Sequence, residues 1–253
     1  MTISLKQWTW ALGAVILVGL WTPPVRAGAT AAAGSDADVL WQEIDQGAPD
    51  PTQVSDPLEP WNRAMFTFNE KLYDWMLQPV ASGYAAMVPE GGRVAVRDVF
   101  HNLEFPIRFV NSLLQGKVAN AGSDLGRFVV NTTLGVGGLF DIAGLHFGLH
   151  AEDEDLGQTL GHYGVGDAVY LVWPVLGSSN ARDTVGTVAD WWLDPLEYYP
   201  EHFWDRIGIK AYKYLNATSL RMEEFESLRS SSLDSYVAVR DAYLKIRTKK
   251  IAQ

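Results

Sequence analysis

The sequence of 253 residues contains no cysteine. This absence excludes disulfides, thiolate nucleophiles, cysteine-ligated zinc and iron–sulfur clusters, and it also excludes a lipid carried on an N-terminal cysteine. Basic residues are scarce as well, because 20 Lys and Arg stand against 30 Asp and Glu, which gives a net charge of −10. Nucleic-acid phosphates favour a basic protein surface, so we expect no nucleic-acid partner.

Long hydrophobic runs and catalytic motifs are also missing. After residue 27 no run reaches the roughly 18 to 20 apolar residues that a membrane-spanning helix needs. The sequence has no Gly-x-Ser-x-Gly elbow, phosphate loop, dinucleotide fingerprint or Ser-x-x-Lys motif. We therefore expect no cofactor, and we do not expect an enzyme.

Histidines leave two weaker chemical alternatives. His146 and His150 are four residues apart, like two zinc ligands on a helix, but glycine interrupts the segment and no glutamate adjoins His146. His162 is a candidate general base for a hydrolase, although no serine or aspartate lies at a recognised spacing from it. We favour a hydrogen-bonding position in a tight loop for His162, and we expect neither a metal site nor a catalytic residue.

The N-terminal segment indicates export. Residues 8–21 form an uncharged run of 14 residues after Lys6, which suits a signal peptide and is too short to span a bilayer. Val25 and Ala27 supply the small residues of a cleavage site, so we predict a signal peptide over 1–27, with an uncleaved anchor helix as the alternative. Cleavage removes two basic residues and no acidic one, which leaves a net charge of −12.

The remaining chain divides into a leader and one domain. Residues 28–54 are rich in Ala, Gly and Pro near their ends and carry acidic but no basic side chains, so we predict a flexible acidic leader. Residues 55–253 are predicted to form a single helical domain. Its first helix is expected to begin with a capping box of Asp56 and Glu59 around Pro57.

Apolar residues recur at helical spacing through most of this domain, and clear alternation typical of strands is nearly absent. The predicted helices cover 57–79, 92–103, 106–115, 117–134, 178–193, 200–228 and 234–246, with an extended segment at 170–176 and a basic tail after the last helix. The fold class is therefore all-α, a bundle of amphipathic helices.

A central region from 122 to 177 holds 12 glycines in 56 residues. Small residues four apart recur there, as at Gly157 and Gly161, and such pairs allow helices to approach closely in lipid or in a buried turn of a soluble domain. Trp and Tyr are plentiful after residue 27, and both favour the membrane interface, although they also fill protein cores.

Three stretches resemble the MlaA/VacJ family of outer-membrane phospholipid-transport proteins. They are residues 56–69 (DPLEPWNRAMFTFN), 127–143 (RFVVNTTLGVGGLFDIA) and 154–166 (EDLGQTLGHYGVG), and residues 174–183 fit as well. The resemblance runs from about residue 55 to 245. It implies a ring-like, all-helical protein at the periplasmic face of the bacterial outer membrane, with a glycine-rich hairpin region beside an amphipathic channel.

The resemblance also implies function and partners. Such a protein binds a trimeric outer-membrane porin and passes mislocalised phospholipid from the outer leaflet to a periplasmic lipid carrier, which maintains lipid asymmetry without bond-making chemistry. Family members commonly carry a lipidated cysteine near the N-terminus, which this sequence lacks. We therefore expect attachment through the apolar belt of the ring and a porin, or through an uncleaved signal helix.

By position, two groups of residues match family features near the channel. Gly164 and Gly166 match the glycines of the flexible hairpin, where backbone freedom permits gating. The segment tied to control of lipid flow is matched by Asn62, Arg63, Phe66, Phe68 and Asn69, for whose aromatic members helix packing is the alternative role. The alternative function is a soluble periplasmic structural or adaptor protein of the same fold that does not transport lipid.

Overall fold

The computed structural model describes residues 55–253, so the predicted signal peptide and acidic leader lie outside the described residues. The described chain is mostly helical, as the sequence predicts. Its helices are α3 (Glu59–Leu72), the π-helical segment η3 (Tyr73–Leu77), α4 (Gln78–Met87), α5 (Glu90–Leu103), α6 (Phe105–Leu114), α7 (Val118–Thr133), α8 (Ile142–Phe147), α9 (Leu156–His162), α10 (Ala181–Asp190), the 3₁₀ turn η4 (Pro195–Glu197), α11 (Phe203–Ser231) and α12 (Ser235–Ala252).

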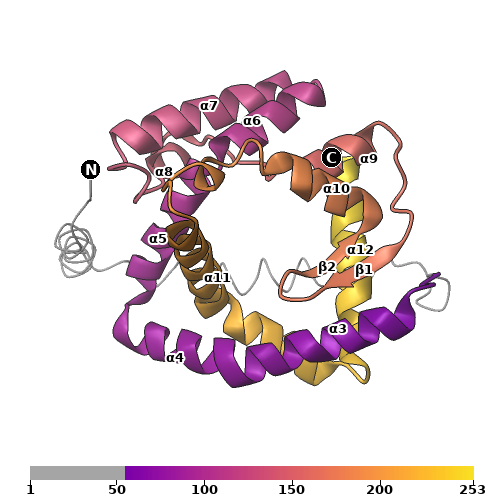
Figure 1. Ribbon diagram of the computed structural model, residues 1–253. Helices are drawn as coiled ribbons and strands as arrows, with labels where there is room; N and C mark the ends of the chain where they lie inside the picture. The colour runs from indigo at the N-terminus through magenta and orange to yellow at the C-terminus, as the bar shows by residue number, and fades with distance from the viewer. Residues whose placement is uncertain (1–54) are drawn as a thin grey trace.

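These helices form a ring around an open centre (Figure 1). In both views α3 and α4 make the lower side, α5 and α11 one flank, α6, α7 and α8 the upper side, and α9, α10 and α12 the other flank. Neighbouring helices in the ring pack in pairs, among them α6 with α7, α9 with α10, and α11 with both α4 and α5. The ring-like arrangement implied by the family resemblance is therefore present.

Local sequence explains most helix ends. Prolines lie in the first turns of α3, α4 and α6, where a missing backbone N–H costs nothing. Asp155, Asn180 and Asp234 accept backbone hydrogen bonds as N-caps of α9, α10 and α12. The predicted capping box of Asp56 and Glu59 is wrong, because Leu58 occupies the N-cap of α3 and the Glu59 carboxylate instead binds Arg63.

A small β-hairpin interrupts the helices. Strand β1 (Tyr170–Trp173) pairs antiparallel with β2 (Gly177–Asn180), with Tyr170 opposite Asn180. The segment predicted as extended at 170–176 therefore contains β1, whereas the helix predicted from 178 begins only after β2. At the other end of the chain, the basic residues expected in a tail belong to α12, which continues to Ala252.

Polarity inside the described domain is unusual. Nine hydrophobic residues are buried in 55–253, against twenty buried polar or charged ones. The apolar clusters are small, one around Val96, Phe100 and Leu196 and the other around Tyr170, Val172 and Tyr236. Ion pairs and hydrogen bonds therefore make many of the contacts between helices. Within the described residues, no helix combines the length and the apolar character needed to cross a membrane.

Candidate functional site

Two asparagines of α3 bind the open edge of the β-hairpin. Asn62, fully buried, donates to the carbonyl of Tyr170 (3.0 Å) and accepts from the backbone N–H of Val172 (2.8 Å). Asn69 repeats this arrangement further along, donating to the carbonyl of Trp173 (2.9 Å) and accepting from the N–H of Val175 (2.7 Å). Each carboxamide therefore forms the two hydrogen bonds, one donated and one accepted, that a backbone residue of a neighbouring strand would form.

The spacing of these asparagines follows from the geometry of helix and strand. Seven residues of an α-helix rise about 10.5 Å, and three residues of a strand rise about 10 Å. A helix lying along a strand therefore presents positions i and i+7 to strand positions j and j+3. We call Asn62, Asn69 and their four backbone partners the asparagine ladder.

Arg63 and Phe66 lie on another side of α3, against the start of α12. The Arg63 guanidinium forms ion pairs with Glu59 (2.7 Å) and Asp234 (2.9 Å) and lies 4.5 Å from the ring centre of Tyr236. Hydrogen bonds from Arg63 hold the pKa of Asp234 below its usual range. Phe66 packs edge-on against Tyr236, with ring centres 5.7 Å apart. These contacts make both residues part of the α3–α12 joint.

A shallow pocket of about 350 Å³ opens at this joint, lined by residues that include Arg63, Phe66, Glu70 and Asp234. Two carboxylates already neutralise its arginine, so the pocket offers no free positive charge to an anion. Phe68, by contrast, is 47% exposed and lies with Trp61 and Trp75 at steps of seven residues along the outside of α3 and η3. The five predicted residues of α3 thus serve three different surfaces.

Gly164 and Gly166 lie in the connection 163–169, which leads from α9 into β1. Gly164 has φ +85°, a left-handed conformation that favours glycine, and neither position has an atom within 4 Å of where a Cβ would lie. The structure therefore brings the two predicted groups to one element: the asparagine ladder holds the edge of the hairpin, and the glycine connection enters it.

Arg182 holds this connection on both sides of Gly166. Its guanidinium donates to the carbonyl of Val165 (3.3 Å) and pairs with Asp167 (2.7 Å), while Asn180 also donates to Asp167 (3.3 Å). Gly166 is thus the free position between two fixed neighbours.

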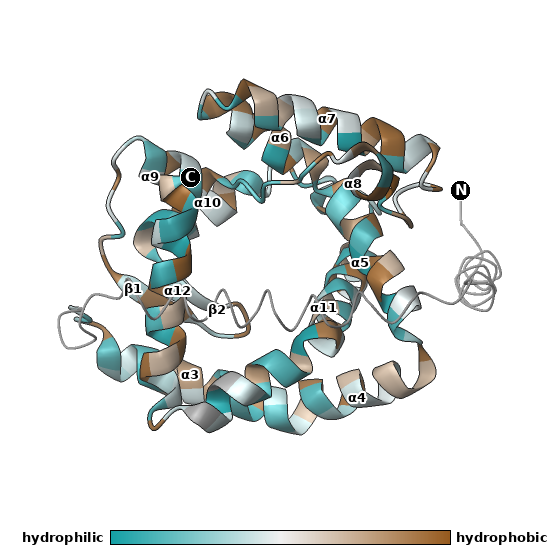
Figure 2. Cartoon of the chain, turned by 180° about the vertical axis from the view of Figure 1, so that it is seen from behind, coloured by the Kyte–Doolittle hydropathy of each residue, from teal (hydrophilic) through white to brown (hydrophobic). Residues whose placement is uncertain are grey.

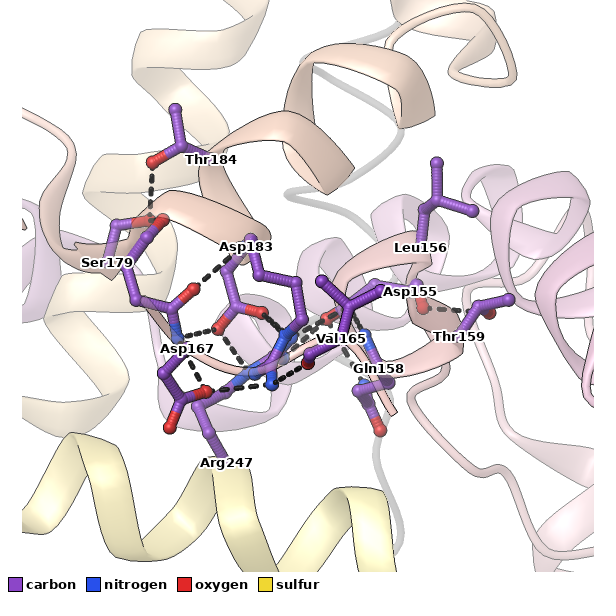
Figure 3. Close-up of polar contacts among 12 residues, drawn as sticks. Asp155, Leu156, Gln158, Thr159, Val165, Asp167, Ser179, Asp183, Thr184 and Arg247 are labelled. Carbon is purple, nitrogen blue, oxygen red and sulfur yellow. Dashed lines mark hydrogen bonds and ion pairs between the residues drawn. The ribbon is translucent and has the colours of Figure 1, made fainter. Parts of the chain in front are cut away.

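A network of charges continues from this connection to α12, and Figure 3 shows Asp155, Asp183 and Arg247 meeting within it. Arg182 binds Asp183 (3.0 Å), and Arg247 binds Asp183 (2.7 Å) and Asp155 (2.6 Å). Burial opposes ionisation of Asp155 and Asp183, but the hydrogen bonds and Coulombic attraction of Arg247, together with hydrogen bonds from other neighbours, outweigh it, so the pKa of each carboxyl lies below its usual range. This network fastens α12 to α9 and α10.

On the surface of α6, α7 and α8 the large exposed residues are mainly hydrophobic, whereas the charged residues lie inside. Between residues 105 and 147 the exposed large hydrophobic side chains are Leu113, Leu114, Val118, Leu125, Val129, Leu134, Val136, Phe140, Leu145 and Phe147. None of the five charged residues in this range is exposed. We call this surface the uncharged face, and Figure 2 shows the hydrophobic residues (brown) along α7 and α8.

Each charge of this range turns inward to a partner. Arg108 lies 3.6 Å from Asp124, Lys117 binds Glu154 (2.7 Å), and Arg127 binds Asp141 (2.9 Å). Burial raises the pKa of Asp124 and lowers that of Arg108, as expected where water is excluded. A surface with apolar residues outside and ion pairs inside suits an apolar environment better than water.

The histidine alternatives gain no support from the geometry. His146 lies in α8, but Gly148 ends that helix in a left-handed conformation, so His150 does not follow on the same helix. His162 is exposed and stacks edge-on against Tyr163. Among residues 55–253, no cluster of three or more His, Asp or Glu side chains is arranged to hold a metal ion.

Sequence reasoning missed the charge network around Arg247. Asp155 and Asp183 lie within the stretches that carry the family resemblance, but their roles depend on Arg247, which looks like one more cation of a basic tail. A signal existed in the glycines, because Gly157 of α9 meets Gly186 of α10 so closely that a Cβ on Gly186 would lie 2.3 Å from the Gly157 nitrogen. Gly157 therefore makes a close helix contact with Gly186, whereas Gly161 meets the side chain of Ile251.

Comparison with known proteins places this architecture among bacterial envelope proteins. Residues 54–250 match the family model described as MlaA lipoprotein. The intermembrane phospholipid transport system lipoprotein MlaA of Escherichia coli is 37% identical over 198 residues, which cover 76% of each chain. The protein of the same name from Haemophilus influenzae is 33% identical, over 77% of this chain and 79% of the relative. An uncharacterized protein of Rickettsia felis is 38% identical over 77% of each chain.

A solved structure shares the fold. It comes from work on the structural basis for maintenance of bacterial outer membrane lipid asymmetry, and it superposes with a TM-score of 0.70 at 36% sequence identity. The match covers 78% of this chain and all of the other.

Proposed function

The chain belongs to the MlaA family, and from this membership we propose that it transports phospholipid and thereby maintains the lipid asymmetry of the outer membrane. The substrate is mislocalised phospholipid of the outer leaflet, which passes through the ring toward a periplasmic carrier. Relatives are named as transport components, and the proposal includes no bond-making step.

One observation carries the proposal, namely the inverted polarity of α6 to α8. All the charges between residues 105 and 147 pair inside the protein, and the outward side chains are apolar. Such a surface is stable against acyl chains, where an exposed charge costs about 2.5 to 3.5 kcal/mol. The ring can therefore lie in one leaflet although no described helix is suited to span the bilayer.

A shielded route is what phospholipid transfer requires. Each methylene exposed to water costs about 0.8 kcal/mol, so moving two acyl chains through water costs roughly 20 kcal/mol or more. A passage that shields the acyl chains from water removes most of this cost. The polar interior contacts of the described domain keep the ring rigid without drawing apolar side chains away from the lipid.

The hairpin is the gating element of the proposal. Gly164 and Gly166 supply its hinge, and Asn62 and Asn69 hold its edge on α3. Arg63 and Phe66 fix the same helix to α12, and Phe68 presents an apolar side chain on its exposed surface. Loss of the two asparagine contacts should therefore change the position of the hairpin.

The remaining parts of the proposal concern location and partners. The chain is exported by its N-terminal segment and lies at the periplasmic face of the outer membrane, attached through the uncharged face rather than through a lipidated cysteine. A trimeric porin and a periplasmic lipid carrier are its partners. Residues 1–54, which would contribute to export, lie outside the described structure.

A charge on the uncharged face tests the proposal. Leu125→Lys places a cation on the exposed side of α7 and should release much of the protein from outer-membrane fractions in a carbonate wash, with phospholipid accumulating in the outer leaflet. Leu233→Lys, at an exposed position of the α11–α12 turn, is the matched control. Wild-type protein that a carbonate wash removes completely would favour the soluble adaptor instead.

A further inference from the structure

The connection between α10 and α11, together with the first two residues of α11, exposes a dense group of aromatic side chains. Six of its fourteen residues, 191–204, are large aromatics with at least 44% of their surface exposed: Trp191, Trp192, Tyr198, Tyr199, Phe203 and Trp204. Trp192 and Trp204 are each 78% exposed. We call residues 191–204 the aromatic segment.

These aromatic residues are not exposed for lack of local structure. Asp194 is buried and accepts a hydrogen bond from the Leu196 N–H (2.9 Å), and Leu196 packs in the core cluster with Val96 and Phe100. Backbone hydrogen bonds continue along the segment, including Tyr198 N–H to Pro195 carbonyl (3.1 Å). The burial of Asp194 and Leu196 and the backbone hydrogen bonds fix the segment on the protein, while its aromatic rings remain exposed.

The aromatic segment differs in chemistry from the uncharged face. Residues 105–147 contain no Trp or Tyr, and their exposed large residues are mainly aliphatic. The aromatic segment adds exposed polar neighbours, Glu201 and His202, to its rings. Both surfaces lie on the same side of the ring in the two views (Figures 1 and 2).

This separation matches the layering of a phospholipid leaflet. Aliphatic side chains favour the acyl region, whereas Trp and Tyr favour the headgroup level, where the ring meets lipid and the N–H or O–H meets water. Charged neighbours are tolerated at the headgroup level but not among acyl chains. A protein partner would require no such division between the two surfaces.

We propose that the aromatic segment lies in the headgroup layer of a phospholipid leaflet and fixes the depth of the ring, with the uncharged face deeper among the acyl chains. The inference rests on the proposed membrane location and adds to it a named second contact and a depth. The aromatic segment is thus an interfacial anchor.

Depth measurement with spin labels tests the anchor, and the sequence suits it because it contains no cysteine to remove. Single-cysteine variants Trp192→Cys, Trp204→Cys, Leu125→Cys and Glu223→Cys are made in the full chain, labelled with a nitroxide and reconstituted in vesicles of phosphatidylethanolamine and phosphatidylglycerol. Power saturation with oxygen and with a water-soluble nickel chelate gives the depth of each label. Circular dichroism melts confirm the fold, and Tyr199→Cys replaces any variant at 192 or 204 that fails to fold.

The expected depths follow from the bilayer. Labels at 192 and 204 should lie about 15 Å from the midplane, the edge of a hydrocarbon core about 30 Å thick, with 125 deeper and 223 in water. The anchor would be overturned if the labels at 192 and 204 were as accessible to nickel as the label at 223, or as deep as the label at 125. In either case a deep label at 125 would still uphold the membrane location. A label at 125 in water would overturn both.

Discussion

At the scale of single residues, the asparagine ladder shows how a few side chains can hold a whole element. The hairpin has two short strands, which alone would be marginally stable. Asn62 and Asn69 satisfy four backbone groups on its open edge, and Tyr170 adds a buried ring. The position of the hairpin therefore depends on two carboxamides of α3.

Removal of the first carboxamide should cost stability. Asn62→Ala leaves the Tyr170 carbonyl and the Val172 N–H buried without partners, so the free energy of unfolding should fall by about 2 to 4 kcal/mol. Urea unfolding measures this loss, and hydrogen exchange at Val172 should accelerate. Lys71→Ala, an exposed change on the same helix, should stay within about 0.5 kcal/mol of wild type.

The two hinge glycines should behave differently. Gly166→Val meets no neighbour within 4 Å and should leave the unfolding free energy within about 0.5 kcal/mol of wild type while impairing lipid removal. Gly164→Val must adopt φ +85° and should lose about 1 to 2 kcal/mol as well. Outer-leaflet phospholipid in cells with equal amounts of each protein is the measurement. Normal asymmetry in the Gly166→Val strain would refute the hinge.

At the scale of elements, the sequence predicted most of the helices but not α8, α9, residues 80–87 of α4 or the second strand of the hairpin. Helical periodicity survives because one side of each helix faces the protein and the other faces outward. Strand β2, Gly-Ser-Ser-Asn, carries no apolar alternation, and its pairing depends on β1 and on Asn180 as the cap of α10. Those partners lie beyond any local pattern.

Contact between α9 and α10 gives an element-scale prediction. Gly186→Ala places a Cβ 2.3 Å from the Gly157 nitrogen, so the helices must separate and the unfolding free energy should fall by about 1 to 3 kcal/mol. Gly122→Ala, in α7, meets nothing within 4 Å and should gain about 0.5 to 1 kcal/mol from helix propensity. Thermal melts of the two variants distinguish the effect of the close contact between the helices from the general effect of replacing a helical glycine.

At the scale of the whole molecule, the folded chain places charged residues inside and apolar residues outside, which the amino-acid composition does not reveal. The net charge of −10 suggests an ordinary acidic soluble protein. The folded chain instead places Arg108, Asp124 and Arg127 inside and leaves leucines and valines of α7 outside. Composition does not say which residues are buried and which are exposed, so it cannot distinguish this arrangement from that of an ordinary acidic soluble protein.

The candidate site was only partly accessible from sequence for a similar reason. Family resemblance identified Asn62, Asn69, Gly164 and Gly166, and spacing alone could not reveal that all four meet one hairpin. Arg247 carries no local signal, because its partners Asp155 and Asp183 come from distant segments, and the contact of Arg182 with Asp167 spans the whole hairpin.

Closure of the ring by α12 gives a prediction with a pH dependence. Arg247→Gln leaves Asp155 and Asp183 without their main partner, so the unfolding free energy at pH 7 should fall by about 3 kcal/mol. Both carboxyls have a lowered pKa in the folded protein, so the stability they contribute is present above about pH 4 and is lost as the pH falls further.

The difference between wild type and Arg247→Gln should therefore shrink below pH 4, as measured by urea unfolding across pH. Arg221→Gln, which removes an exposed ion pair with Glu224, is the control and should show little change at any pH. A constant difference from pH 7 to pH 3 would contradict the assignment of the lowered pKa values to Arg247.

The asparagine ladder has one more consequence, for the crowding of many copies in one membrane. An unpaired strand edge is a template on which another chain can add a strand, and neighbouring copies held at the same depth would meet edge to edge. Asn62 and Asn69 occupy the Tyr170 carbonyl, the Val172 N–H and the Trp173 carbonyl of β1, and the Val175 N–H just beyond it. Because these groups are already bonded to α3, β1 offers few of the hydrogen-bonding groups that a strand from a neighbouring copy would need.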